Sequence, residues 1–239
     1  MTRSIDWPHH IHILIPAYNA QESLSRILPQ ILEIVPADHI TIVDDGSAVS
    51  AKAICQSHGI TCIENRPNRG KGFALRTGFA TLLKQKGTDW IITLDADGQH
   101  AIDDLHLFVE AATHNPPAGI IIGRRQFMPG TMPPHRIFSN FMTSKALSLI
   151  CKAPVLDSQC GYRAYSTEML ARITLEFDRF EMESEVIIKA CAAQFPVRFV
   201  PIRTLYLDGK SNINNVLDTF RWLRGVWKAW RNIKRPLPR

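Results

Sequence analysis

The feature that most constrains the fold is an alternation of short apolar runs with longer segments of helical spacing. The expected strands lie at residues 11–17, 39–43, 60–63, 90–94, 120–122 and 197–202. The expected helices lie at residues 22–34, 48–58, 72–84, 138–150 and 183–193. Short strands that alternate with helices are typical of right-handed βαβ units. The sequence therefore predicts an α/β fold with a mostly parallel central sheet flanked by helices.

The chain divides into one large domain and a basic extension. We expect a single domain over residues 8–212 and an amphipathic helix in the extension 213–239. Apolar residues recur in the extension at steps of four and three, which marks one helical face. They are Val216, Phe220, Leu223, Trp227 and Trp230. This face could lie in a membrane interface, or it could pack on the main domain.

Charge and composition restrict the class of partner. The 28 Lys and Arg residues exceed the 22 Asp and Glu residues by six, and no acidic residue follows Asp218. No recognised nucleic-acid motif accompanies this charge, so we do not expect a nucleic-acid partner. The five cysteines include no C-x-x-C pair, which favours the reducing cytosol. Without a long apolar segment, the chain is expected to be cytoplasmic and peripheral at the inner face of the membrane.

Two aspartates follow the expected strand 90–94 directly. Asp95 and Asp97 stand one residue apart, and Gln99 follows at the same spacing. Mg²⁺ and Mn²⁺ prefer carboxylate oxygens and often take their other ligands from substrate phosphates. The pattern indicates such a metal site, although a solvated turn with two acids would read the same way.

Two other expected strands also end in polar clusters. Asp44 and Asp45 precede a Gly-Ser turn, where a carboxylate could accept from a nucleobase or a ribose hydroxyl and Ser47 could cap the next helix. The segment NRGKGFALRTG at 68–78 places Lys71 between Gly70 and Gly72. Glycines let backbone approach a ligand, and a lysine at a helix N-terminus favours phosphate. The spacing matches neither a P-loop nor a dinucleotide fingerprint.

Taken together, these segments resemble a known family. IPAYN, VDDGS, NRGKGFALRTG and DADGQH occur in this order, each after its own expected strand. They closely resemble the family 2 glycosyltransferases, whose A-type glycosyltransferase fold is Rossmann-like and binds nucleotide sugars. GRR at 123–125, DSQCGYRAY at 157–165 and FEMESEVIIKA at 180–190 resemble the dolichyl- or polyprenyl-phosphate mannosyl and glucosyl transferase branch. The resemblance covers residues 10–212.

The resemblance implies roles on the donor side. It places Pro16, Tyr18 and Glu22 beside the nucleoside. Asp44 and Asp45 would hold the base or ribose, and Lys71 would lie near the nucleotide. Asp95, Asp97 and Gln99 would bind Mg²⁺ or Mn²⁺ against the diphosphate of a GDP- or UDP-hexose.

It also implies roles for catalysis and the acceptor. Asp97, Arg124, Glu183 and Glu185 match catalytic positions. Arg124, Arg136, Arg163 and Lys210 match positions that bind phosphate or the acceptor, although the order Gly-Lys-Ser-Asn around Lys210 departs from the family pattern. Arg125 would be further positive charge available to hold a phosphate.

The expected activity is transfer of a hexose, with inversion, from a nucleotide sugar to a polyprenyl phosphate such as dolichyl or undecaprenyl phosphate. A phosphate acceptor needs no base because its second pKa near 6 leaves it largely ionised at neutral pH. A sugar-hydroxyl acceptor in surface polysaccharide or glycolipid synthesis would need one, and Glu183 or Glu185 could serve. A non-catalytic nucleotide-sugar-binding protein at the membrane surface is a second alternative.

Overall fold

The computed structural model describes residues 6–113, 118–126, 134–205, 224–226, 228, 229 and 231, with backbone alone at 134–136. The strands are β1 (Ile11–Ala17), β2 (Ile40–Asp45), β3 (Thr61–Asn65), β4 (Trp90–Thr93), β5 (Ile120–Arg125), β6 (Arg163–Ser166) and β7 (Val197–Ile202). The helices are α1 (Gln21–Leu32), α2 (Lys52–Ser57), α3 (Lys71–Leu82), α4 (Leu105–Thr113), α5 (Pro134–Cys151), α6 (Thr167–Arg172) and α7 (Glu181–Ala192). The α/β prediction is confirmed.

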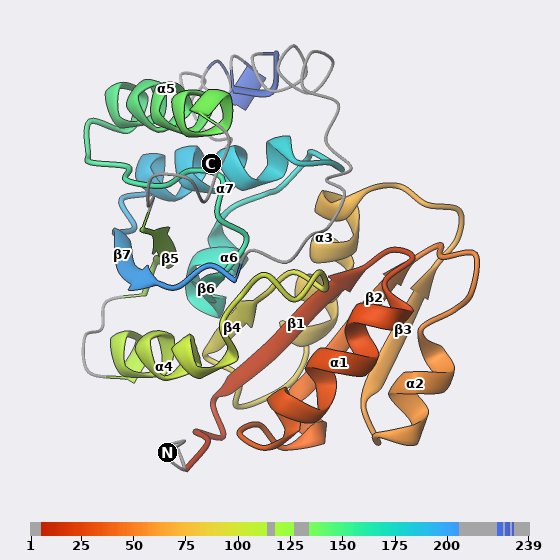
Figure 1. Ribbon diagram of the computed structural model, residues 1–239. Coiled ribbons are helices and arrows are strands. Elements are labelled where there is room, and N and C mark those ends of the chain that lie inside the picture. Colours follow the sequence, from red (N-terminus) through yellow and green to blue (C-terminus); the bar gives the residue numbers. More distant parts are fainter. Residues whose placement is uncertain are drawn as a thin grey trace.

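The strands form one seven-stranded sheet in the order β3-β2-β1-β4-β6-β5-β7 (Figure 1). Strand β6 is antiparallel to β4 and β5, and the other paired strands are parallel. All strands except β6 therefore run in one direction, and their carboxyl ends meet at one edge. Strand β6 begins at that same edge, because Arg163 pairs with Thr93 at the end of β4.

Helices cover both faces of the sheet. Figure 1 shows α1 and α2 in front of the β1–β3 half and α3 behind it. The expected apolar face of α1 is confirmed, since Leu24, Ile27, Leu28 and Ile31 are buried. Helix α3 packs closely on β1 at Gly78, where an added Cβ would come 2.3 Å from a Leu14 methyl carbon. These contacts fix the start of α3, and with it Lys71, beside the polar edge.

Helices α4 and α6 and strand β6 were not predicted from the sequence. The sequence of α4 does show helical periodicity, because its buried residues Leu105, Phe108, Val109 and Ala112 are spaced three, one and three positions apart. Strand β6 has only four residues and no apolar run, yet all four are buried. Its pairing with β4 and β5 supplies the stability that its composition does not indicate.

Candidate active site

The turn after β4 presents two carboxylates in different environments. The side chain of Asp95 is 28 % exposed and faces the domain. Asp97 is exposed, and one of its oxygens accepts a hydrogen bond from the backbone N–H of Gln99 at 2.9 Å. Gln99 is half-buried. The three predicted metal-site residues thus share one short turn at the carboxyl edge of the sheet.

Lys71 joins two carboxylates that come from distant parts of the chain. Its Nζ lies 2.6 Å from Oδ1 of Asp95 and 2.6 Å from Oε1 of Glu183. We call these three residues the Lys71 bridge. Burial acts to lower the pKa of Lys71, but the two carboxylates outweigh it and raise that pKa. Burial acts to raise the pKa of Asp95, but Lys71 and His100 hold it well below its usual range.

His100 also contacts the site. Its Nε2 lies 3.4 Å from the second oxygen of Asp95, and its ring packs 4.9 Å from the ring of Tyr162. No role in the site was predicted for His100 from the sequence. The turn after β4 brings it to Asp95, which is five positions away, whereas its ring contact with Tyr162 depends on tertiary packing.

The segment before β6 lies directly against the Lys71 bridge. A Cβ added to Gly161 would come within 2.7 Å of both oxygens of Asp95 and of Lys71 Nζ. Thr93 in β4 donates to the carbonyl of Gly161 at 2.9 Å. Glycine at position 161 therefore leaves room for the Asp95 and Lys71 side chains, and no role in the site was predicted for it from the sequence.

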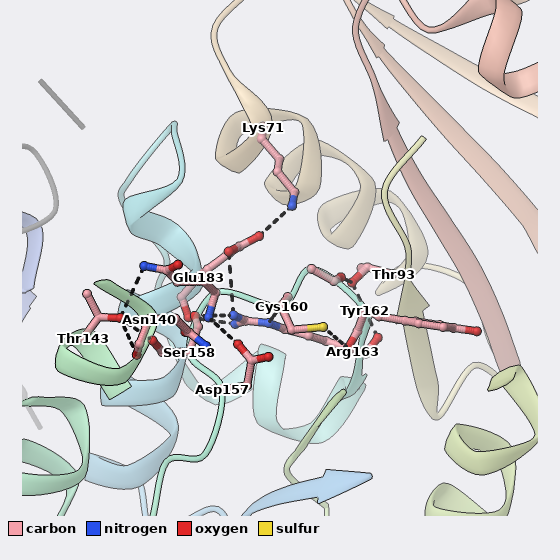
Figure 2. A network of polar contacts seen from close by, with 12 residues as sticks. Lys71, Thr93, Asn140, Thr143, Asp157, Ser158, Cys160, Tyr162, Arg163 and Glu183 are labelled. Atoms are coloured by element: carbon pink, nitrogen blue, oxygen red, sulfur yellow. Dashed lines mark hydrogen bonds and ion pairs between the residues drawn. The ribbon is translucent and has the colours of Figure 1, made fainter. Parts of the chain in front are cut away.

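Arg163 holds this segment in place from within the core. Its guanidinium is fully buried and donates to the carbonyl oxygens of Ser158, Cys160 and Glu183 at 2.6–2.9 Å. Figure 2 shows Arg163 among these groups, with Glu183 between it and Lys71. The acceptor-contacting role predicted for Arg163 does not fit this position, because no part of the side chain reaches the surface. Arg163 instead holds the backbone of residues 158–160 and of Glu183 in place beneath the site, within the core.

Gly70 and Gly72 serve a different purpose from the one expected. An added Cβ at Gly70 would lie 2.6 Å from the carbonyl oxygen of Asp178, and one at Gly72 would lie 2.7 Å from that of Arg179. The N–H of Phe73 donates to the Asp178 carbonyl at 2.9 Å. These glycines therefore let the backbone of residues 177–179 approach α3, and this packing connects Lys71 to α7.

The two other predicted catalytic residues, Arg124 and Glu185, and the predicted phosphate-holding Arg125 occupy three different kinds of position. Arg124 is exposed at the end of β5, on the same edge as Asp95. Glu185 is completely buried and accepts from the N–H groups of Glu176 and Phe177, with Lys189 at 2.7 Å. A catalytic role for Glu185 does not fit these contacts. Arg125 is not spare charge either, because it forms a two-point ion pair with the fully buried Asp157.

Asp44 and Asp45 have internal partners. The carboxylate of Asp44 accepts from the N–H groups of Ser47 and Ala51 at 3.0 and 2.7 Å. That of Asp45 accepts from the N–H groups of Arg69 and Gly70 at 3.0 and 2.6 Å. Both residues are buried and shape the loops at the sheet edge. Their predicted contact with a nucleoside stays a prediction.

The remaining predicted residues lie at the ends of β1 and α1 or outside the described part. Pro16 is half-buried, whereas Tyr18 and Glu22 are exposed beside the same edge. The side chain of Arg136, the whole of Lys210 and the apolar stripe Val216–Trp230 lie outside the described residues. Of the C-terminal extension, Val226 and Ala229 are buried, and Lys228 lies 3.9 Å from Glu176. These described positions pack on the main domain.

The donor set is compatible with Mg²⁺ or Mn²⁺ under one condition. Within the described ranges, no cluster of three or more His, Cys, Asp or Glu side chains could hold a metal ion without other ligands. Asp95 and Asp97 supply two carboxylates, which is what Mg²⁺ commonly takes from a protein when substrate phosphates complete its shell. The residues therefore fit an ion whose remaining ligands are waters or the phosphates of a substrate.

Comparison with known proteins identifies the family. The sequence profile of Glycosyl transferase family 2 matches residues 12–174, so this chain is a member of that family. It is 33 % identical over 89 % of both chains to an uncharacterized protein of Methanocaldococcus jannaschii. It is 30 % identical to the UDP-N-acetylglucosamine–dolichyl-phosphate N-acetylglucosaminyltransferase of Methanococcus voltae, over 83 % of this chain and 86 % of the relative. An undecaprenyl-phosphate mannosyltransferase of Micrococcus luteus is 28 % identical over 92 % and 96 %.

A solved structure confirms the A-type glycosyltransferase fold. Glucosyl-3-phosphoglycerate synthase from Mycobacterium tuberculosis, crystallised with Mn²⁺, uridine diphosphate and phosphoglyceric acid, superposes with a TM-score of 0.71. The match covers 94 % of this chain and 78 % of the other at 17 % identity. At this identity the likeness concerns the fold alone.

Proposed function

We propose that this protein transfers a hexose from UDP- or GDP-hexose to a polyprenyl phosphate, with inversion and with Mg²⁺ or Mn²⁺. Two relatives with different sugars, N-acetylglucosamine and mannose, share a lipid-phosphate acceptor by name. Their matches extend over most of this chain, which supports the same acceptor class here. The sugar itself is left open by this comparison.

The observation that carries the proposal is the position of Glu183. Its carboxylate is the candidate base that remains after Glu185 is assigned to the core. Its side chain is 9 % exposed, and Oε1 is already bound by Lys71. Arg163 lies 3.8 Å from the other oxygen, Oε2, so a sugar hydroxyl that gave its proton to Glu183 would have to compete with a cation at either oxygen. A phosphate monoester is largely ionised at neutral pH and attacks without a base, so this arrangement favours the phosphate acceptor.

The residues at the carboxyl edge of the sheet have separate proposed roles. Asp95 and Asp97 would hold the divalent ion, which supplies neutralising charge for the diphosphate leaving group. Arg124, exposed at the end of β5, is available to stabilise phosphate charge at the same edge. Asp45 and the glycines at 70 and 72 fix the start of α3, and this holds Lys71 within reach of Asp95 in the turn after β4.

Helix α5 supports a membrane-bound acceptor. The distribution of polar and apolar side chains on α5 is the reverse of that on an ordinary surface helix. Asn140, Thr143 and Ser144 are buried, whereas Phe138, Phe141 and Leu149 are 61–74 % exposed. Thr143 and Ser144 bond to Ser158, and Asn140 accepts from Ser144; Figure 2 shows part of this network. Exposed apolar faces of this kind mark interaction surfaces, and a lipid surface would bring a polyprenyl phosphate to the protein. Among the described helices, none is long and apolar enough to cross a bilayer.

A donor and acceptor panel tests the proposal. The protein is incubated with Mn²⁺ and each of several UDP- and GDP-hexoses, with undecaprenyl phosphate, with a saccharide, or with neither. We expect release of nucleoside diphosphate that depends on the lipid. Release that requires the saccharide would support the hydroxyl-acceptor alternative, and no release with any combination would support a non-catalytic binding protein.

A further inference from the structure

The Lys71 bridge and the proposed metal site share one carboxylate. We propose that Lys71 competes with the divalent ion for Asp95, so that ion binding requires Lys71 Nζ to leave Oδ1 of Asp95. This inference rests on the proposed function, because it takes Asp95 as a metal ligand. It assigns to Lys71 and Glu183 a role in controlling the metal site in addition to any contact with the nucleotide.

The geometry places the ammonium on the same carboxylate that the ion would use. Lys71 Nζ lies 2.6 Å from Oδ1 of Asp95, and His100 lies 3.4 Å from Oδ2. A divalent ion of this type needs an oxygen at about 2.0–2.2 Å. The backbone of Gly161 closes another side, since a Cβ there would fall within 2.7 Å of Nζ and of both Asp95 oxygens. An ion on Asp95 would therefore strongly repel an ammonium that stayed on the same carboxylate.

Glu183 gives the displaced lysine a second partner. Its Oε1 is 2.6 Å from Nζ, the same distance as Asp95 Oδ1, so Lys71 can release one carboxylate while it keeps the other. Glu183 is itself held, because Arg163 lies 3.8 Å from Oε2 and donates to the Glu183 carbonyl at 2.7 Å. The flexible lysine side chain can therefore give up its contact with Asp95 and stay bound to Glu183. Glu183 is therefore a positioning residue that acts through Lys71.

The proposal predicts effects of opposite sign at the two ends of the bridge. Lys71→Met removes the competing charge and should strengthen binding of Mn²⁺ alone. Glu183→Gln leaves Lys71 with Asp95 as its one anionic partner and should weaken Mn²⁺ binding. We expect roughly tenfold in each direction, since removal of a unit charge a few ångströms from the ion changes its binding by at least this much. Mn²⁺ binding is measured without nucleotide, by electron paramagnetic resonance of the free ion.

Matched variants separate this effect from others. Arg69→Met removes a cation two residues away that pairs with Asp178 and not with Asp95, so it should leave Mn²⁺ affinity unchanged. Lys71→Met leaves the buried Glu183 carboxylate without its closest cation, which could destabilise the fold. The double variant Lys71→Met/Glu183→Gln avoids this problem and should still bind Mn²⁺ more tightly than the wild type.

Asp95→Asn distinguishes failure of this inference from failure of the metal assignment. If Asp95→Asn binds Mn²⁺ as well as the wild type, Asp95 is not a metal ligand and the proposed site is wrong. If Asp95→Asn loses Mn²⁺ while Lys71→Met and the double variant match the wild type, the metal site stands and the competition is disproved. Absence of measurable binding in both the wild type and the Lys71→Met variants would also overturn the competition.

Discussion

Lys71 and Glu183 are 112 positions apart in the chain, yet Nζ of the first lies 2.6 Å from Oε1 of the second. Lys71 is the first residue of α3, and Glu183 lies in the first turn of α7. The contact exists because Gly70 and Gly72 allow residues 177–179 to pack directly on the start of α3. It brings together two motifs that are distant in the sequence, the segment at 68–78 and the segment at 180–190.

Asp97→Ala should abolish turnover and leave the fold intact. The side chain is exposed and makes one local hydrogen bond, to the Gln99 N–H, so little stability depends on it. Loss of a metal-bound carboxylate should lower kcat/KM by about 100-fold or more, since even outer-shell changes at metal sites cost 10–100-fold. The measurement is steady-state release of nucleoside diphosphate with a melting curve. Asp103→Ala, which removes an exposed acid paired with Arg203, is the matched control. Full activity in Asp97→Ala would disprove the metal assignment.

Gly161→Ala should impair turnover by displacing the Lys71 bridge. The new methyl would lie within 2.7 Å of Asp95 and Lys71, so at least one of them must move by a large part of an ångström. Misplacement on this scale can lower kcat/KM by about 100-fold. Gly87→Ala provides the comparison, because its Cβ would meet nothing within 4 Å although its φ of +89° is strained. That control should lose about 1–2 kcal/mol of stability and keep its kcat. Equal kcat values in the two variants would contradict a role for Gly161 in the site.

The stability of the fold should decrease below pH 6.5 because of His12. Burial, together with the nearby His39, lowers the pKa of His12 from 6.5 to about 4. Between these values the unfolded chain binds the proton and the folded chain does not, so acid favours unfolding. The contribution of His12 is complete above pH 6.5 and is lost as the pH falls toward 4, with a total on the order of 2 kcal/mol after allowance for solvent screening.

His12→Gln, which can still bond to Thr41, should lack this component. Urea unfolding of both proteins at pH 7, 5.5 and 4.5 measures it. Parallel pH profiles for the two proteins would show that His12 is not responsible.

Phe138→Ser/Phe141→Ser should weaken binding to lipid vesicles without loss of fold. Both rings are more than 60 % exposed on α5, so they contribute little to the core. Transfer of two such side chains into lipid is worth about 3 kcal/mol or more, which corresponds to roughly 100-fold in partitioning. Co-sedimentation with anionic vesicles measures it, and Val49→Ser, at a position 69 % exposed elsewhere on the surface, is the control. If the double variant sediments like the wild type, the α5 face does not bind the membrane.

The order of strands and helices and the position of the polar edge follow from local sequence. Strands β1 and β7 begin and end where the apolar runs predict, and the clusters at Asp44–Asp45 and Asp95–Asp97 fall at the ends of parallel strands. Short-range periodicity and parallel topology are enough for this result, because the carboxyl ends of such strands must share one edge. Family membership follows from the same clusters in their order.

The partners of each side chain were decided by tertiary structure alone. Arg163 and Glu185 were predicted to contact the acceptor and to act in catalysis, but packing buries both. Arg163 donates to backbone carbonyls, and Glu185 accepts from backbone N–H groups and pairs with Lys189. Gly161 and His100 lie in the motifs DSQCGYRAY and DADGQH, but their contacts are not readable from these letters. Gly161 reaches Asp95 because β6 pairs antiparallel with β4. A single sequence records which charges exist, whereas burial and long-range contact determine which of them remain available to a substrate.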